Sequence, residues 1–407
     1  MVSFTDRIRK LLRRPPKQRP PKSPPASNIS PKPPPQQPGD SARQAPLALD
    51  GADDSSRAAA VTPATSSGQL RINLTNQTTS SQVYAYITGS AIDRGGQLFL
   101  LSADGRTPYY PTNPSSTGTK LTTDISIRLG APGSTTAATI PRLAGGRIWF
   151  SIGSPLVFAV NPGPGLVEPS VFNQADPNIG TNFGFAEFTF NASQVFANIS
   201  YVDFVSLPIA LTLRDTGGRT QRVAGLPPNG LDLIANGLRA QTTKDGRRWS
   251  SLIVPTSPSD NRPLRILSPN SGLLLNPTWF QNYWQPHVDR VWDAFTYKQL
   301  TIDTQSGYGE IDGQVRRSDN LFDFGAQVGT FAKPSTADIF SCSTGPFATG
   351  TNAARNTVIP RLAAALNRST LVLQGAVATP AVGEGPERYY TTPISNVRRS
   401  CAHGRCR

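Results

Sequence analysis

The chain has 407 residues, of which 37% are hydrophobic and 16% charged, with 38 prolines and 35 glycines. This length allows one large domain or two ordinary ones, and the turn-rich, weakly charged composition favours a β protein over a helical bundle. The formal net charge is +14, of which residues 1–40 contribute +7 and the last eleven residues +4, leaving +3 for everything between. Because the basic charge belongs to the two ends, it argues against a nucleic-acid-binding domain.

The cysteines and histidines limit the chemistry of the chain. Cys342, Cys401 and Cys406 allow at most one disulfide bridge, and the segment from Cys401 to Cys406 has too few ligands for a structural zinc site. His287 and His403 are the only histidines, which argues against a histidine-based catalytic triad. We therefore expect no metal site. No apolar run is long enough to span a membrane, so no transmembrane segment is expected either.

Residues 1–68 are expected to form a disordered, basic, Pro-rich arm. Proline pairs and a proline triplet between Pro15 and Pro35 favour polyproline II, and Ser, Gln and Ala fill much of the rest. Such a segment cannot build a core. Residues 1–14 lack the unbroken apolar stretch of a secretory signal peptide.

Residues 69–222 are predicted to form an antiparallel β-barrel or sandwich. Short runs rich in strand-forming residues, several of them alternating apolar and polar, are separated by Gly, Pro, Ser and Asn. The predicted strands are Gln69–Thr75, Val83–Gly89, Gln97–Ser102, Asp124–Leu129, Gly146–Gly153, Leu156–Val160, Phe183–Asn191, Tyr201–Val205 and Leu207–Leu213.

Residues 223–330 are predicted to form a mixed α/β domain, with a groove between it and the β domain. We expect a helix over Pro228–Leu238, a helix pair from Asn276 to Phe295 broken at Pro286, and strands over Gln299–Asp303 and Gly309–Val315. Residues 331–395 are expected to return to the β-barrel through a helix at Asn356–Asn367 and a strand at Ser369–Gln374. Residues 396–407 are interpreted as a basic tail.

Two carboxylates in the β-rich part, Glu187 and Asp203, are the candidate catalytic pair. Strand alternation puts Phe185, Glu187, Thr189 and Asn191 on one face of their strand and Ala186, Phe188 and Phe190 on the other. In a hairpin centred near Val195, Glu187 and Asp203 would lie at nearly matching positions. Two strand-borne carboxylates facing one cleft are what the cleavage of a glycosidic bond requires. For a single strand Glu, however, solvation or pairing with a nearby Arg is the commoner arrangement.

From Gln69 to about Gln374 the chain resembles glycoside hydrolase family 64, the β-1,3-glucanases related in fold to thaumatin-like proteins. The stretches that carry the resemblance are Glu187–Asn191, Tyr201–Phe204, Leu207–Ala210, Tyr283–Trp292, Lys333–Cys342 and Asn367–Leu371. The resemblance implies a mainly β fold, in which a thaumatin-like β-barrel or sandwich domain and a mixed α/β domain border a wide groove for β-1,3-glucan. It also implies endo-type hydrolysis with inversion of configuration and without a cofactor.

The resemblance assigns roles residue by residue. Glu187 matches the general acid of the family and Asp203 its general base. Thr189 and Asn191 match positions that contact sugar. Phe196 falls where an aromatic residue, often Trp, is expected, so it keeps a stacking face but lacks an indole donor.

Three functions are left open by the sequence. The first is an inverting endo-hydrolase of β-1,3-glucan, expected to be monomeric and to bind no nucleic acid. The second is a non-catalytic β-1,3-glucan-binding protein on the same scaffold. The third is an interaction protein organised by the Pro-rich arm. The family resemblance suggests secretion, whereas no signal peptide is visible, so the localisation stays open.

Overall fold

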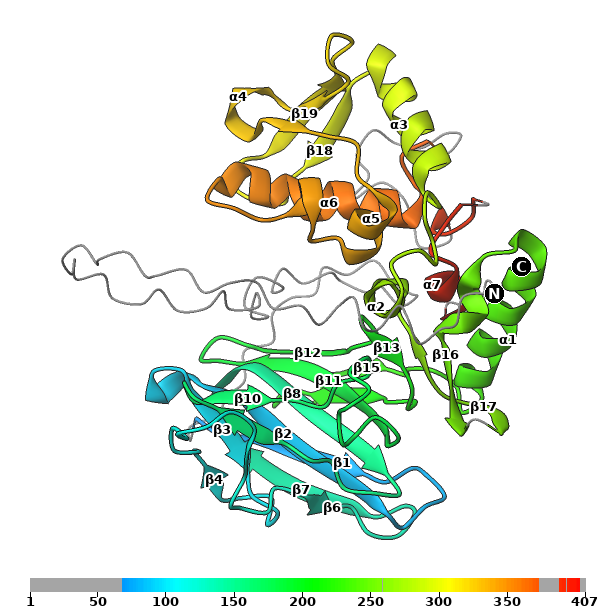
Figure 1. Cartoon of the computed structure of the whole chain (residues 1–407). Helices are drawn as coiled ribbons and strands as arrows, with labels where there is room; N and C mark the ends of the chain where they lie inside the picture. Colours follow the sequence, from blue (N-terminus) through cyan, green and yellow to red (C-terminus); the bar gives the residue numbers. More distant parts are fainter. Residues whose placement is uncertain (1–67, 258, 373–387, 393, 403–407) are drawn as a thin grey trace, which may run out of the picture. The chain divides into compact units, whose positions relative to one another are not determined.

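In a computed structural model of the chain (Figure 1), residues 68–257, 259–372, 388–392 and 394–402 are described. The predicted arm therefore lies outside the described residues except for Gly68. All described residues belong to one compact unit. Among them, no helix combines the length and the apolar composition that crossing a bilayer requires.

The first half of the described chain is a set of antiparallel sheets, as predicted. The largest has the strand order β12-β11-β8-β2-β3-β4, with β6 also paired to β2, and smaller sheets pair β1 with β7, β9 with β10 and β5, and β14 with β15. Figure 1 shows β2, β8 and β11 side by side. The strands are β1 (Leu70–Thr75), β2 (Val83–Ala91), β3 (Gln97–Leu101), β4 (Pro108–Tyr109), β5 (Thr119–Lys120), β6 (Ile127–Arg128), β7 (Thr135–Ile140), β8 (Leu143–Ile152), β9 (Ala159–Asn161), β10 (Gly165–Val167), β11 (Asn182–Phe190), β12 (Val195–Ile199), β14 (Leu211–Arg214) and β15 (Thr220–Val223).

Alternating side chains of the large sheet enter two separate cores. Trp149 and Phe185 belong to one buried cluster, whereas Ile148 and Phe188 belong to another, which also takes in the β1–β7 pair. This division follows from the two-residue period of a strand, which sends neighbouring side chains to opposite faces. The predicted alternation along β11 is thereby confirmed.

The second half mixes helices with two further sheets, of strand order β13-β17-β16 and β18-β19-β20-β21. Its elements are β13 (Phe204–Val205), α1 (Gly230–Asp245), β16 (Ile253–Ser257), β17 (Asp260–Leu267), α2 (Pro269–Leu275), α3 (Gln285–Tyr297), β18 (Leu300–Asp303), β19 (Glu310–Val315), β20 (Phe322–Asp323), α4 (Gly325–Val328), β21 (Thr330–Phe331), α5 (Thr336–Ser341), α6 (Ala353–Arg368) and α7 (Val397–Ala402). Short 3-10 helices occupy Ile92–Arg94, Arg248–Leu252 and Gly345–Phe347.

The helix pair predicted around Pro286 is wrong in its first half. Residues 277–284 are turns and bends, and the side chain of Asn276 accepts hydrogen bonds from the amide and the hydroxyl of Thr278 at 3.0 and 2.8 Å. Pro286 does not interrupt a helix but lies in the first turn of α3. A proline is tolerated there because the N–H that it lacks has no intrahelical partner at that position.

The structure also differs from the prediction for residues 331–402. Strand β21 completes the β18–β20 sheet, while α5 packs against α2 and α6 packs against α4, α5 and β18, so the described residues from 331 to 368 join the second half of the chain. Helix α6 ends at Ser369 in the left-handed conformation, with φ of 60°, and residues 369–372 form no strand.

The expected basic tail is wrong in its described part. Residues 397–402 form helix α7, which packs against α1, and both Arg398 and Cys401 are buried. Cys401 is disulfide-bonded, whereas Cys342 is a free thiol. Residues 403–407 lie outside the described part of the chain.

Candidate active site

Glu187 lies on β11 between two partner strands that share its face. It stands directly opposite Arg147 of β8 on one side and Asn198 of β12 on the other. Directly opposed residues of antiparallel strands point to the same face of the sheet. The Glu187 side chain is 34% exposed, so a ligand on this face can reach it.

The carboxylate of Glu187 contacts a guanidinium that is shared with a second acid. Arg147 donates from Nη2 and Nε to Oε1 of Glu187, at 3.3 and 3.4 Å, and from Nη1 to Oε2 of Glu168. The amide of Asn198 lies 3.5 Å from Oε2 of Glu187. Glu187 is therefore paired with an Arg, which is the common arrangement for a strand Glu. This Arg, however, contacts two carboxylates, Glu187 and Glu168.

Aromatic rings hold Arg147 in place. Its guanidinium carbon lies 5.1 Å from the ring centre of Phe185 and 5.7 Å from that of Trp149. The indole N–H of Trp149 donates to Thr88 Oγ1 at 3.2 Å, which satisfies the buried donor. Cation–π contacts of this length stabilise a guanidinium while it remains able to donate in its own plane.

Asp203 directly precedes β13, and its main chain is fixed by two other elements. Its carbonyl accepts hydrogen bonds from the amide of Ser268 at 2.7 Å and the hydroxyl of Ser271 at 3.1 Å, at the beginning of α2. The buried Arg398 of α7 donates from Nη2 to the carbonyl of Tyr201 at 2.7 Å and lies 3.4 Å from that of Val202.

An aromatic contact brings the Asp203 segment to the Glu187 face of β11. Phe204 follows Asp203, and its ring centre lies 6.0 Å from that of Phe185 and 5.3 Å from that of Phe183. Phe185 is two residues before Glu187, on the same face. The two candidate carboxylates therefore come from segments that pack on each other.

The predicted pairing of Glu187 with Asp203 in one hairpin is wrong. The β11–β12 hairpin turns at Asn191, whose side-chain oxygen accepts from the amides of Ser193 and Gln194 at 2.8 and 2.9 Å. This tight turn places Phe190 opposite Val195 and hence Glu187 opposite Asn198. Because β12 ends at Ile199, Asp203 falls outside the hairpin.

The three predicted sugar-contacting residues have different surroundings. Thr189 stands opposite Phe196 on the same face as Glu187, and Phe196 is 42% exposed. Asn191 lies beyond the end of β11, with its oxygen engaged in the turn. Thr189 and Phe196 thus extend the Glu187 face, whereas Asn191 shapes the hairpin.

Four residues at the site were not predicted from the sequence, namely Arg147, Glu168, Asn198 and Arg398. Arg147 lies 40 residues from Glu187, and Arg398 lies 197 residues from Tyr201. The one local signal is the double glycine before Arg147. The ring of Phe188 lies where a Cβ on Gly146 would stand, 2.4 Å from its nearest atom, so the strand pair at this site requires a glycine.

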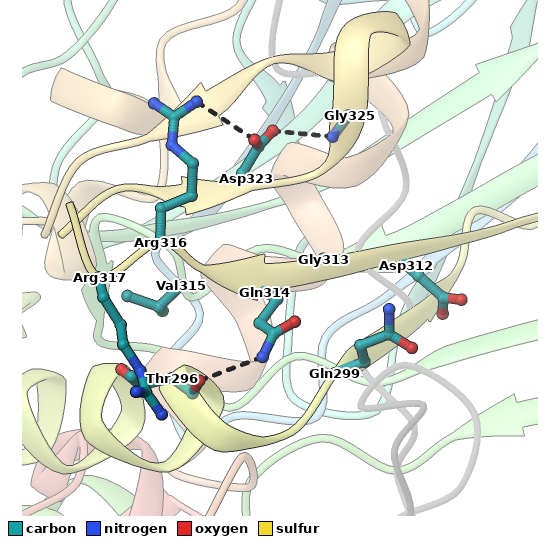
Figure 2. Close-up of a pocket in the computed structure, with 10 residues that line it drawn as sticks. All are labelled: Thr296, Gln299, Asp312, Gly313, Gln314, Val315, Arg316, Arg317, Asp323 and Gly325. Atoms are coloured by element: carbon teal, nitrogen blue, oxygen red, sulfur yellow. Dashed lines mark hydrogen bonds and ion pairs between the residues drawn. The ribbon is translucent and has the colours of Figure 1, made fainter. Parts of the chain in front are cut away.

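A separate polar pocket of about 530 Å³ lies at α3, β18, β19, β20 and α4 (Figure 2). Figure 2 shows Arg316 and Asp323 pointing toward each other, 3.3 Å apart, and the amide of Gln314 donating to the carbonyl of Thr296 at 3.1 Å. None of the lining residues comes from β11, β12 or the Asp203 segment. Since its polar groups largely pair with one another, we do not base a function on it.

Within the part of the chain that the structure describes, no group of three or more His, Cys, Asp or Glu is close enough to hold a metal ion. The candidate site therefore consists of carboxylates, a guanidinium, amides and aromatic rings. A partly exposed carboxylate and an exposed aromatic ring on one face of an antiparallel sheet define a carbohydrate-active protein as the class that fits best.

The sequence profile of glycoside hydrolase family 64, described as beta-1,3-glucanase, matches residues 68–404, and the chain belongs to this family. The resemblance seen in the sequence is thereby confirmed. Two relatives named glucan endo-1,3-beta-glucosidase, from Cellulosimicrobium cellulans and Arthrobacter sp. (strain YCWD3), are each 26% identical over 70% of this chain. The match covers 49% of each relative, so the chain spans about half of their length.

Solved structures of the family have the same fold. A laminaripentaose-producing beta-1,3-glucanase in complex with laminaritetraose is 27% identical, with a TM-score of 0.71 over 83% of this chain and 89% of that one. A beta-1,3-glucanase domain from Clostridium beijerinckii is 23% identical, with a TM-score of 0.60 over 82% of this chain and 88% of that one, and shows the fold alone.

Proposed function

We propose that the chain hydrolyses β-1,3-glucan internally, with Glu187 as general acid and Asp203 as general base. The observation that carries this proposal is the exposed carboxylate of Glu187 on a sheet face that also holds Thr189 and Phe196, with the Asp203 segment packed beside it. Membership in glycoside hydrolase family 64 and the laminaritetraose complex of a structural relative supply the substrate class.

The chemistry needs two carboxyl groups in opposite protonation states. Glu187 would donate a proton to the oxygen of the scissile bond, while Asp203 would take a proton from the water that attacks the opposite side of the sugar ring. Inversion by this route requires about 6.5–9.5 Å between the carboxyl groups, so that a water molecule fits. The glucan would lie along the β11–β12 face with a sugar ring on Phe196.

The Asp203 segment lies beside a buried cation. Burial, assisted by the charge of Arg399, lowers the pKa of Arg398 to about 9, and the negative charge of Asp203 acts in the opposite direction. The proposal requires an ionised Asp203, because a general base must accept a proton.

The test is the release of reducing sugar from linear β-1,3-glucan by the full chain and by Glu187→Gln and Asp203→Asn. We expect activity in the parent and a loss of about 100-fold or more in each variant, the range for removal of a general acid or base. Matched controls are Glu310→Gln and Asp232→Asn, at exposed positions of β19 and α1, which should retain full activity. Retained activity in either Glu187→Gln or Asp203→Asn would refute the assignment.

The same assay separates the alternatives. A parent that binds linear β-1,3-glucan but releases no sugar would be the non-catalytic glucan-binding protein. For an active parent, the anomeric configuration of the first product, measured by NMR, distinguishes inversion from retention. Inversion yields the α-anomer from a β-linked glucan.

A further inference from the structure

One guanidinium lies between two carboxylates at the candidate acid. Arg147 contacts Glu187 through Nη2 and Nε and Glu168 through Nη1. All three side chains are partly withdrawn from water, with 15% of Arg147, 30% of Glu168 and 34% of Glu187 exposed. Arginine keeps its charge at every pH of interest, so this triad has a net charge of −1 when both acids are ionised.

Within the triad, two carboxyl groups share one cation. β8 contributes Arg147, the segment after β10 contributes Glu168, and β12 contributes the uncharged Asn198. A carboxylate beside a cation tends to remain ionised, whereas a second carboxylate beside the first tends to hold its proton. A single proton on the triad therefore gives the neutral arrangement.

The contacts of Arg147 to the two acids differ. The contacts of Arg147 to Glu187, at 3.3 and 3.4 Å, are longer than the usual 2.7–3.2 Å of N–H···O hydrogen bonds and are therefore weak. Both of them reach Oε1, whereas Oε2 of Glu187 lies 3.5 Å from the amide nitrogen of Asn198.

We propose that Glu168 is a positioning residue that retains Arg147 as its own ion-pair partner and so leaves Glu187 free to hold the proton that it donates to the glycosidic oxygen. This inference rests on the proposed hydrolysis, with Glu187 as its acid. In this arrangement the ion pair with Glu168 keeps the guanidinium of Arg147 from pairing closely with Glu187. Phe185 and Trp149 assist because they restrict the movement of Arg147 toward Glu187.

The first test is the pH dependence of hydrolysis by Glu168→Gln, which removes the charge but preserves the size of the side chain. Arg147 then has Glu187 as its one carboxylate partner within the triad, so Glu187 loses its proton at a lower pH. We expect the alkaline limb of the kcat/KM profile to move down by about 1 pH unit. At neutral pH kcat should fall about 10-fold while KM changes less than about twofold. Glu310→Gln, at an exposed position of β19, is the matched control and should keep the parent profile.

Rescue by a second change distinguishes positioning from a structural role. In Glu168→Gln combined with Arg147→Met, the cation is gone and a side chain of similar length still fills the space against Trp149 and Phe185. The alkaline limb should return toward its position in the parent. A limb that is unmoved in Glu168→Gln would overturn the proposal. So would complete inactivity of Glu168→Gln at every pH, because Glu168 would then be a catalytic residue itself.

A direct titration of the Glu187 carboxyl group tests the proposal without a measurement of hydrolysis. The ¹³C signal of the Glu187 side-chain carboxyl, assigned by its loss in Glu187→Gln, can be followed against pH in the full chain and in Glu168→Gln. A lower midpoint in Glu168→Gln supports the proposal even if the parent hydrolyses no glucan, in which case only the proposed function fails. Equal midpoints refute the proposal whatever the activity.

Discussion

Phe196 is the exposed ring through which the β11–β12 face would hold a sugar. It stands opposite Thr189, two residues from Asn198 on the Glu187 face, and is 42% exposed. Phe196→Ala should raise the KM for linear β-1,3-glucan and leave kcat nearly unchanged, because the ring binds ground state and transition state alike. The loss of stacking area is worth about 1–2 kcal/mol, or about 5- to 30-fold in KM.

Two further substitutions test whether the ring of Phe196 stacks on a sugar. Phe196→Trp keeps the ring face and adds an N–H donor, so it should hold KM at or below the parent value. Tyr297→Ala removes a ring that is 77% exposed on α3 and should alter neither constant. An unchanged KM in Phe196→Ala would place the substrate away from this face.

His287 should make the stability of the fold depend on pH. Its ring is fully buried, and neither ring nitrogen has a hydrogen-bond partner among the residues that the structure describes. Burial, assisted by the charge of Arg290, lowers its pKa from 6.5 to about 4. The unfolded chain therefore binds a proton at this residue more readily than the folded chain does. Stability from His287 is complete above about pH 6.5 and is lost as the pH falls toward 4, by at most on the order of 3 kcal/mol.

The measurement is the free energy of unfolding in urea at pH 7.5 and pH 4.5. Carboxyl groups also titrate in this interval, so the comparison is with His287→Phe, which cannot take up a proton. The stability of the parent should fall more steeply between the two pH values than that of the variant. Parallel decreases would show that His287 does not sense the pH.

At the scale of elements, α7 should be required for activity even though it is far from the candidate site in sequence. Arg398 on α7 donates to the carbonyl of Tyr201, and Ser268 and Ser271 at the start of α2 hold the carbonyl of Asp203. Arg398→Met removes the guanidinium donor of the part-buried Tyr201 carbonyl, at a cost of about 1–3 kcal/mol. We expect a lower melting temperature and a kcat reduced about 10-fold or more.

Truncation after Asn396 provides a second measurement of the same contact. The truncated chain lacks α7 entirely and should lose at least as much kcat as Arg398→Met. Arg405→Met, outside the described helix, is the matched control for the loss of one positive charge. If the truncated chain kept parent activity, α7 would have no function in placing Asp203.

Local patterns along the sequence were sufficient to predict many of the elements. Alternation identified β1 and the two faces of β11, a high content of strand-forming residues identified β2, β3 and β8, and helical spacing identified the body of α3. Prediction failed where a single side chain decided the outcome. Asn191 caps the turn that sets the β11–β12 register, and a proline that suggested a break instead begins α3. The two candidate acids can be named from the sequence, whereas the residues that contact them cannot.

The missing partners share one property, which is that they are distant in the chain. The β8–β11 register decides that Arg147 faces Glu187, and packing of the last helix decides that Arg398 reaches Tyr201. No residue pattern within one strand reports either contact. A pair of carboxylates can thus be proposed from sequence, whereas the charges that set their protonation states require the assembled sheet.

At the scale of the whole molecule, the charge of the chain and its family domain occupy different residues. Residues 1–40 contribute a net charge of +7, and the match to the family begins at residue 68. Each function should therefore depend on its own part of the chain. Hydrolysis of a soluble, neutral glucan should depend on the part from residue 68 onward, and attraction to anionic surfaces on the part before it.

Deletion of residues 1–67 tests this separation. The shortened chain should hydrolyse soluble linear β-1,3-glucan with kcat and KM within about twofold of the full chain, because every residue of the proposed site lies after the deletion. Its binding to vesicles that contain anionic lipid should fall, and the salt dependence of that binding should weaken, since a cluster of like charges is screened over about 10 Å at 0.1 M salt. Loss of glucan hydrolysis on deletion would instead show that the arm takes part in catalysis or folding. It would revive the hypothesis of an interaction protein organised by its arm, because the arm could then no longer be treated as separate from the glucanase domain.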